Sequence, residues 1–445
     1  MITSLLKQCP VIAIDERGIP RLLTELSNKD LPFEKKVKSL QMLERFLTRL
    51  SQDSLVFLPD CVNTLFFIAY LCVTKLPSFD LRNIHELTPE KLKSYDESCN
   101  QPILNTLIST LSCFLKLSKI PSLYDVCFPE IAFSIDKSKA ESHALPIKLT
   151  ESSEDIPDEK EPKLSLEFEH QSRREGKQGQ RRHFIPCIPI SVEQRLSILS
   201  DIIINSPPSS RKLGIEFITQ VCEHSLFTTF ESRFLSLKMI DALDQSFGIK
   251  YFPSFCSTPS ESSFTLAPTP LFYYSNPLYS SVLFLIENVS SFTSVRLLLM
   301  RTNLVNFILH CSSVSGLEQL IMSIFSNMSG VPGLNSHLIG RGVISCVMFC
   351  LCRKDEKILS KALITLQNLT ASPEASLSSF IRTISVFHPT ELFDSWPFVS
   401  QDVHLSYYYT RLMRSLCVDG EFRALYEEKA SPEVKHCVHL SETSK

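Results

Sequence analysis

Residues Gly330 to Ser372 read GVPGLNSHLIGRGVISCVMFCLCRKDEKILSKALITLQNLTAS, and this stretch predicts three consecutive helices. A short helix, roughly Gly333 to Ile339, is interrupted by glycines, where a chain turns sharply at little steric cost. A wholly apolar helix from Val343 to Cys352 follows, and a third helix runs from near Glu356 to near Thr370. Because the third helix carries a broad apolar stripe, it needs apolar neighbours on more than one side. The unit is therefore expected to lie between similar units.

Similar units are present on both sides of this stretch. The third helix ends A-L-I-T-L-Q-N-L, and two upstream copies of that ending also carry asparagine, at Asn327 and Asn288. The intervals are 41 residues (327 to 368) and 39 residues (288 to 327), and a fainter copy places Ser415 in the asparagine position. A recurrent period near 40 residues is typical of a helical solenoid.

On these residues, Gly342 to Leu369 resembles an armadillo repeat, with a glycine before the second helix and the A-L-x-x-L-x-N-L ending. The resemblance covers Ser281 to about Leu425 in at least three units. It implies an all-α fold, a right-handed α-solenoid of armadillo-like repeats.

The sequence divides into four regions, of which the first, residues 1–135, is helical in pattern and is expected to be a degenerate repeat region. Residues 136–187 hold few large apolar side chains and two charged blocks, so they are expected to be a disordered charged insert. The solenoid is expected over 188–430, with a long loop rich in proline and aromatic residues at 251–279, and a flexible tail over 431–445.

The charged insert carries two candidate signals. Ser152 and Ser153 precede Glu154 and Asp155, which is a pattern for phosphorylation by an acid-directed kinase. The arginine pairs within 173–182 fit a nuclear import signal. The alternative is a solvated linker whose acidic and basic blocks attract each other loosely.

The amino-acid composition limits the classes of protein to which this chain can belong. With 44% hydrophobic residues and a net charge of −3 over 445 residues, the chain can bury a core and is not drawn to nucleic acid or anionic membranes. Its 15 cysteines fall mostly in apolar helical runs, which favours free thiols in a reducing compartment, so an intracellular and cytoplasmic rather than nuclear location is expected. No signal peptide is apparent, and the apolar run Cys61 to Thr74 is shorter than the roughly 20 residues of a membrane span. It predicts a buried solenoid helix.

Motifs for catalysis and metal binding are absent from the sequence. It holds no phosphate-binding glycine loop, no G-x-S-x-G and no H-E-x-x-H. Cys346 and Cys350 lie one turn apart on an apolar helix, and Cys437 lies between two histidines, but neither group has the ligand set of a zinc site. We therefore expect no cofactor, no metal and no enzymatic activity, although a triad of distant residues escapes a motif search.

The three asparagines carry the sharpest hypothesis. The resemblance implies that third helices line the concave face and that Asn288, Asn327 and Asn368 bind the main chain of an extended peptide. A carboxamide suits this task because it offers both a donor and an acceptor. The alternative is that these asparagines cap helix C-termini and form hydrogen bonds between repeats. The sequence leaves open both peptide binding and this alternative. Each asparagine also begins an N-x-[S/T] pattern, which the repeat ending explains without glycosylation.

Two further residues join the predicted groove. One turn before the asparagines, the nuclear-import adaptors of the armadillo family carry tryptophan, whereas this chain has Phe284, Ser323 and Ile364, so binding of nuclear signals is not expected. Lys361, two turns before Asn368, favours an acidic side chain in a ligand.

The sequence thus predicts a non-catalytic scaffold or adaptor that binds an extended segment of a partner protein along a solenoid groove. The alternative is a structural subunit of a larger assembly, with an apolar interface on the N-terminal half.

Overall fold

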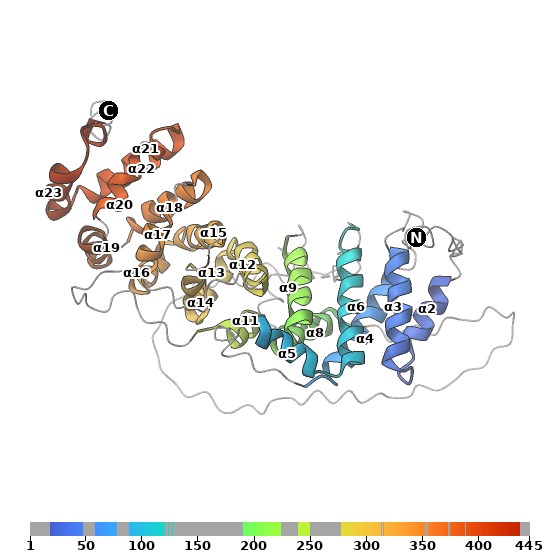
Figure 1. Cartoon of the computed structure of the whole chain (residues 1–445). Coiled ribbons are helices and arrows are strands. Elements are labelled where there is room, and N and C mark those ends of the chain that lie inside the picture. The colour runs from blue at the N-terminus through green and yellow to red at the C-terminus, as the bar shows by residue number, and fades with distance from the viewer. Residues whose placement is uncertain are drawn as a thin grey trace, which may run out of the picture.

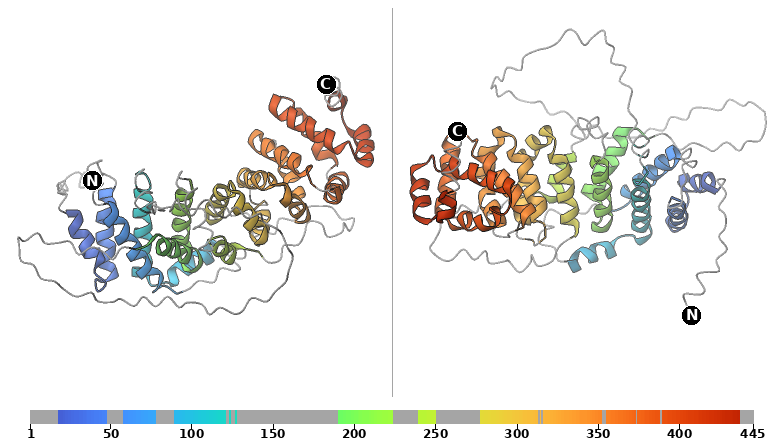
Figure 2. Two further views of the ribbon diagram at one scale, coloured as in Figure 1. Left: turned by 180° about the vertical axis from the view of Figure 1, so that it is seen from behind. Right: turned by 90° about the horizontal axis from the view of Figure 1, so that it is seen from above.

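The computed structural model describes residues 18–47, 58–77, 89–120, 123, 127, 190–223, 239–249, 277–312, 314, 316–351, 355–372, 374–387 and 389–436. Within these ranges the regular elements are helices, with no strand. They form an elongated, curved stack with the N-terminal helices at one end and the C-terminal helices at the other (Figures 1 and 2). The predicted all-α solenoid is confirmed.

One layer of the stack is a continuous row of helices, each packed on the next. In Figure 1 this row follows the concave side of the curve, and we call it the inner layer. Its members are α3 (Phe33–Leu47), α6 (Gln101–Leu117), α9 (Pro208–Glu223), α12 (Pro277–Ser290), α15 (Glu318–Ser329), α18 (Glu356–Leu369) and α22 (Val403–Leu416).

The remaining helices lie behind the inner layer and cover its apolar face. The larger ones are α2 (Gly18–Ser27), α4 (Leu58–Val73), α5 (Pro89–Ser98), α8 (Val192–Asn205), α11 (Met239–Phe247), α13 (Thr293–Arg301), α14 (Leu304–Cys311), α17 (Val343–Leu351), α19 (Glu374–Phe387) and α23 (Gly420–Lys429). The short ones are α16 (Asn335–Gly340), α20 (Pro389–Asp394) and α21 (Trp396–Val399). One apolar core runs through both layers from end to end.

The stretch 330–372 folds as its sequence predicts. A single turn at Pro332–Leu334 leads into α16, and the chain then bends by 86° before α17. Gly342 sits at the bend with φ of +83°, a left-handed conformation that suits glycine because it has no Cβ. Asp355 begins α18, and its Oδ1 accepts hydrogen bonds from the backbone N–H of Lys357 (3.0 Å) and Ile358 (3.2 Å).

The helices of region 1–135 belong to the same stack as the C-terminal repeats. Helix α6 packs on α9, α9 packs on α12, and α4 packs on α8. At the first of these joints the buried Phe114 ring lies 4.6 Å from the Phe66 ring and 4.8 Å from the Phe217 ring, measured between centroids. The solenoid is therefore continuous across the chain segment that contains the charged insert.

Buried cations close helix ends in the N-terminal half. Lys36 is fully buried, and its Nζ donates to the carbonyl oxygens of Leu26 (2.9 Å) and Asn28 at the end of α2. Arg211, also fully buried, donates to the carbonyls of Ile204 (2.8 Å) and Ser206 (3.1 Å) at the end of α8, and burial lowers its pKa to about 9. A cation at a helix C-terminus satisfies the last carbonyls and opposes the helix dipole.

The ten described cysteines are free and buried, as predicted from their place in apolar runs. Burial raises the pKa of Cys61 and of Cys72 to about 12, so both thiols are protonated at neutral pH. The run around Cys61 forms α4, with nine side chains in the core. Of the described helices, none is by itself both long and apolar enough to span a membrane, and 332–340 with 343–351 qualifies only as a bent pair.

Several predicted segments fall wholly or partly outside the described residues. The insert 136–187, with Ser152 and Ser153, lies outside them, as does most of the predicted loop 251–279. The end of that loop is helical, because α12 begins at Pro277, a residue well suited to a first helical turn. In the predicted tail, 432–436 is helical and Val434 is buried.

Candidate functional site

The asparagines of the inner layer form hydrogen bonds between successive repeats. Asn327 Nδ2 donates to Ser290 Oγ (2.9 Å), and Asn368 Nδ2 donates to Ser329 Oγ (3.1 Å). Each acceptor serine stands two residues after the asparagine of the preceding repeat. The recurrent N-x-S pattern therefore encodes a ladder in which Asn327 and Asn368 each reach back to the serine of the previous copy.

The ladder ends differently at its two extremities. At the N-terminal end, Asn288 Nδ2 donates to the Glu223 carboxylate of α9 (3.1 Å) in an exposed position. At the C-terminal end, the fully buried Asn335 donates to the carbonyl of Asn368 (2.8 Å) and closes the end of α18. The hydrogen-bonding alternative left open by the sequence is thus realised in the structure.

The ladder uses only part of each carboxamide. Asn288, Asn327 and Asn368 are all half-buried, and their Oδ1 atoms accept no hydrogen bond from a described residue. Each side chain is held in place by its own Nδ2 bond while an acceptor stays free. Such an acceptor is able to receive a main-chain N–H from a bound segment.

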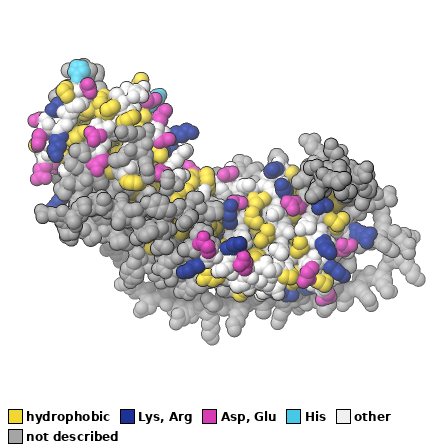
Figure 3. All heavy atoms as spheres, in the orientation of Figure 1, with side chains coloured by type: hydrophobic (Ala, Val, Ile, Leu, Met, Phe, Trp, Pro, Cys, Tyr) yellow, Lys and Arg dark blue, Asp and Glu magenta, His cyan; other side chains and the backbone are white. Residues whose placement is uncertain are grey.

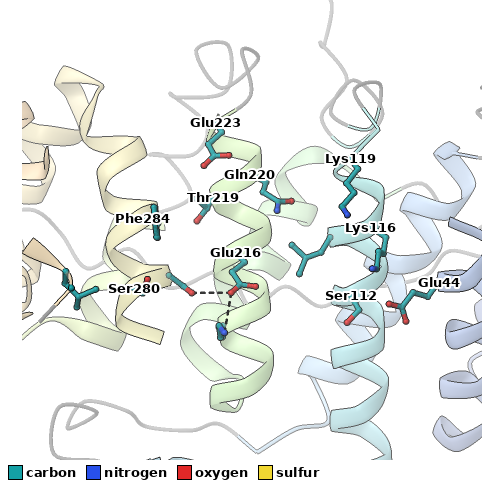
Figure 4. A pocket seen from close by; sticks show the side chains of 15 residues that line it. Glu44, Ser112, Lys116, Lys119, Glu216, Thr219, Gln220, Glu223, Ser280 and Phe284 are labelled. Atoms are coloured by element: carbon teal, nitrogen blue, oxygen red, sulfur yellow. Dashed lines mark hydrogen bonds and ion pairs between the residues drawn. The ribbon is translucent and has the colours of Figure 1, made fainter. Parts of the chain in front are cut away.

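The larger cavity on the inner layer, which we call the N-terminal cavity, has a volume of about 990 Å³. It opens over α3, α6, α9 and α12, and Figure 4 shows its side chains converging from these helices. Phe284 projects from the α12 side and is 47% exposed. The other wall is formed by the end of α6, with Lys116 and Lys119.

The acidic groups of α9 in this cavity are already engaged. The Glu216 carboxylate lies 3.6 Å from Lys212 Nζ and accepts a hydrogen bond from Ser281 Oγ (3.4 Å). Glu223 accepts the bond from Asn288. Lys116 and Lys119, in contrast, form no ion pair with a described residue. The cavity therefore holds unpaired cations at the end of α6, hydrogen-bonded carboxylates on α9, and on α3 the Glu44 carboxylate, which has no ion pair with a described residue.

A second cavity, which we call the C-terminal cavity, lies further along the same face and has a volume of about 580 Å³. It is lined by α15, α18 and α22, with Ser323, Lys361, Ile364, His404 and Tyr408 among its residues. Asp402, at its edge, caps α22 by accepting a hydrogen bond from the Leu405 N–H (2.8 Å). Both cavities therefore open on the inner layer.

The predicted site residues separate into two groups. Phe284 lines the N-terminal cavity and Lys361 lines the C-terminal cavity, whereas the three asparagines line neither. Peptide contact by any of them stays a prediction. Among the described residues there is also no cluster of three or more His, Cys, Asp or Glu side chains arranged to hold a metal.

Sequence reasoning missed the groove residues of the N-terminal half. The order of buried and accessible residues along α12 matches the order along α9 and α6 when Gln220 and Lys116 are aligned with Asn288. Neither helix carries the asparagine ending, so the copies cannot be aligned by motif. The signal available in the sequence is the pair of apolar residues, three positions apart, that stands on either side of Lys116, Gln220 and Asn288.

The class of protein that this fold and site define is an α-helical repeat protein with an open inner face. No known family model matches the chain, and no curated protein sequence matches it. Among solved structures, a designed armadillo repeat protein in complex with a (KR)4 peptide matches at 10% identity, over 55% of this chain and 96% of that one, with a TM-score of 0.38. Two crystal structures of engineered proteins also match at 10% identity. One covers 95% of this chain and 87% of its own with a TM-score of 0.45, and the other covers 51% and 82% with a TM-score of 0.38.

Proposed function

We propose that this protein is a non-catalytic scaffold or adaptor that binds an extended segment of a partner protein along its inner layer. The observation that supports this most is the position of the two cavities. Both open on the same continuous row of helices. A row of parallel helices offers equivalent positions at regular intervals, which suits a ligand with a repeating backbone.

An extended segment brings unpaired main-chain N–H and C=O groups that need partners when they leave water. The inner layer supplies acceptors in register, through the free Oδ1 atoms of the three asparagines. Gln220, in the equivalent place on α9, has a buried Oε1 with no hydrogen-bond partner. A bound segment is able to donate its main-chain N–H groups to these oxygens in place of water.

We further infer that the repeats are armadillo repeats and that the protein acts inside the cell, in the cytoplasm. The first inference rests on the glycine and the A-L-x-x-L-x-N-L ending of 342–369, and the second on the buried free thiols.

The alternative, a structural subunit with an apolar interface on the N-terminal half, finds no supporting feature in the residues that the structure describes. In the described part of that half, Met42 is the one large apolar side chain counted as exposed. On the face seen in Figure 3, charged side chains of both signs are interspersed with the apolar ones. Interspersed charge is typical of a solvated surface.

A selection experiment tests the proposal. The purified full chain is used to select binders from a displayed library of random peptides about twelve residues long, which reach roughly 40 Å when extended. Selected peptides are then measured by fluorescence anisotropy against the wild type and a groove variant, Phe284→Asp with Lys361→Glu. We expect the groove variant to bind at least about tenfold more weakly.

The matched control changes the same residue types away from the cavities, as Leu297→Asp with Lys38→Glu, since both residues are exposed and line neither cavity. It is expected to keep the wild-type affinity within about twofold. Failure to select any peptide, or equal loss in the two variants, overturns the proposal.

A further inference from the structure

We propose that the N-terminal cavity recognises an acidic side chain and, several residues along the same segment, an apolar side chain. Lys116, in the last turn of α6, and Lys119, in the turn after it, receive the acidic group, and Phe284 of α12 receives the apolar one. This inference rests on the proposed function, because it names the chemistry of the segment that the inner layer binds.

Lys116 and Lys119 are the unpaired cations on the α6 side of the cavity. Lys116 is half-buried in the last turn of α6, Lys119 is exposed in the turn that follows the helix, and both line the cavity. Figure 4 shows both lysines on the α6 side of the cavity, and it shows Glu44 of α3 beside Ser112 and just below Lys116. Because neither lysine has an ion-pair partner among the described residues, a carboxylate from outside is able to pair with them at no loss of an existing bond.

The facing acids of α9 already take part in bonds within the protein. Glu216 already pairs with Lys212 and accepts from Ser281, and Glu223 already accepts from Asn288. A cationic ligand would have to compete with these bonds and would meet Lys116 and Lys119 as like charges. The arrangement therefore favours an anionic ligand group at the end of α6, where the two unpaired cations lie.

Phe284 supplies the apolar contact. Its ring is 47% exposed, although its neighbours Leu283 and Leu285 are fully buried in the core. It is one of six large apolar side chains exposed in the described residues, and of these six it alone lines a cavity. An aromatic ring at a cavity wall buries apolar area when a ligand side chain covers it.

The spacing of the two features sets the register of the ligand. Helices α6 and α12 are separated by α9, and packed helices lie about 8–10 Å apart, so the two features lie roughly 16–20 Å apart along the groove. An extended chain advances about 3.3 Å per residue. The acidic and the apolar ligand residues are thus expected about five or six positions apart.

The peptide library described above tests this inference by the sequences it yields. Selection on the wild type is expected to enrich Asp or Glu about five or six positions from Leu, Ile, Phe or Tyr. A charge-reversal variant, Lys116→Glu with Lys119→Glu, is expected to bind those peptides at least about tenfold more weakly, since each exposed charge contact contributes up to about 1 kcal/mol, or roughly fivefold, and reversal adds repulsion.

The control is Lys35→Glu with Lys38→Glu, which makes the same charge change on exposed lysines of α3 that line neither cavity. It is expected to bind as the wild type does at moderate salt. Enrichment of basic peptides, or equal weakening in both variants, overturns the acidic-ligand inference and leaves the groove standing. If no peptide is selected at all, both the inference and the proposed function fail.

Discussion

The two halves of the inner layer are joined in different ways. From α12 to α18 the repeats are linked by asparagine–serine hydrogen bonds of one kind, whereas α6 and α9 are joined by stacked phenylalanines and carry Lys116 and Gln220 in the asparagine place. The joints from α12 to α18 therefore share a repeated polar bond, whereas the joint of α6 with α9 has stacked rings in its core. The same solenoid geometry is thus compatible with two kinds of joint.

The difference explains why the repeat period is visible in one half of the sequence and not in the other. A hydrogen-bond ladder requires the same residues at the same place in each copy, so it leaves a visible sequence period. An apolar joint requires only complementary volume, which many residues supply. The N-terminal cavity lies where the ladder gives way to the apolar joint, at α9 and α12.

The largest expected effect is at the apolar joint. Phe114→Ala removes a fully buried ring that contacts Phe66 and Phe217, and the cavity left behind is expected to lower the free energy of unfolding by about 3–5 kcal/mol. Urea denaturation followed by circular dichroism measures it. Phe284→Ala is the control, with an expected loss below about 1 kcal/mol because that ring is half exposed. Equal losses at the two positions would show that Phe114 does not hold the joint.

A smaller effect is expected at the C-terminal end of the ladder. Asn335→Ala removes the donor to the Asn368 carbonyl, and we expect a loss of roughly 1–2 kcal/mol, because the buried Asn335 side chain itself has one unsatisfied oxygen. Hydrogen exchange is expected to speed up at the end of α18 and to stay unchanged in α6. Uniform acceleration along the whole chain would contradict this local role.

The ladder bonds themselves are expected to be weaker still. Asn327→Ala and Ser290→Ala each remove one half of a partly buried hydrogen bond, and each is expected to cost about 1 kcal/mol. Because the two residues form one bond, the double variant is expected to cost less than the sum of the singles by about 0.5–1 kcal/mol. Strict additivity in this cycle would mean that the ladder does not couple the repeats.

The smallest effect is expected where the ladder meets the N-terminal half. Asn288→Ala breaks an exposed bond to Glu223, and exposed bonds of this kind contribute a few tenths of a kcal/mol. Thermal melting of this variant is expected to match the wild type within about 1 °C. A destabilisation as large as that of Asn327→Ala would place the boundary between the two kinds of joint elsewhere.

Much of the fold follows from the sequence because the apolar stripe is a local signal. The three helices of 330–372, the glycine turn at Gly342 and the start of α18 after Asp355 all appear as predicted. Helices α2 and α5 lie in region 1–135, which is helical in pattern, but neither was placed individually from the sequence. Helix α5 has no fully buried side chain among its described residues, so its sequence carries no strong stripe.

The site was less predictable than the fold. The asparagines were found because they repeat, yet their serine partners were read only as part of a glycosylation-like pattern. Their pairing depends on which helices are neighbours, which is a property of the fold and not of a single helix. Lys116 and Gln220 were not identified from the sequence for the same reason, because only the packing of the helices shows that α6 and α9 belong to the inner layer.

The most direct test of the inner layer as a binding surface is photo-crosslinking in the native cell. Benzoylphenylalanine is placed at position 284 in one version of the full chain and at position 297 in another; both native side chains are about equally exposed, and only the first lines a cavity. Binding of an extended segment predicts adducts at 284, mapped by mass spectrometry to one short linear stretch of a partner, and none above background at 297. Adducts at 297 but not at 284, or adducts at 284 scattered over a folded partner surface, would contradict it.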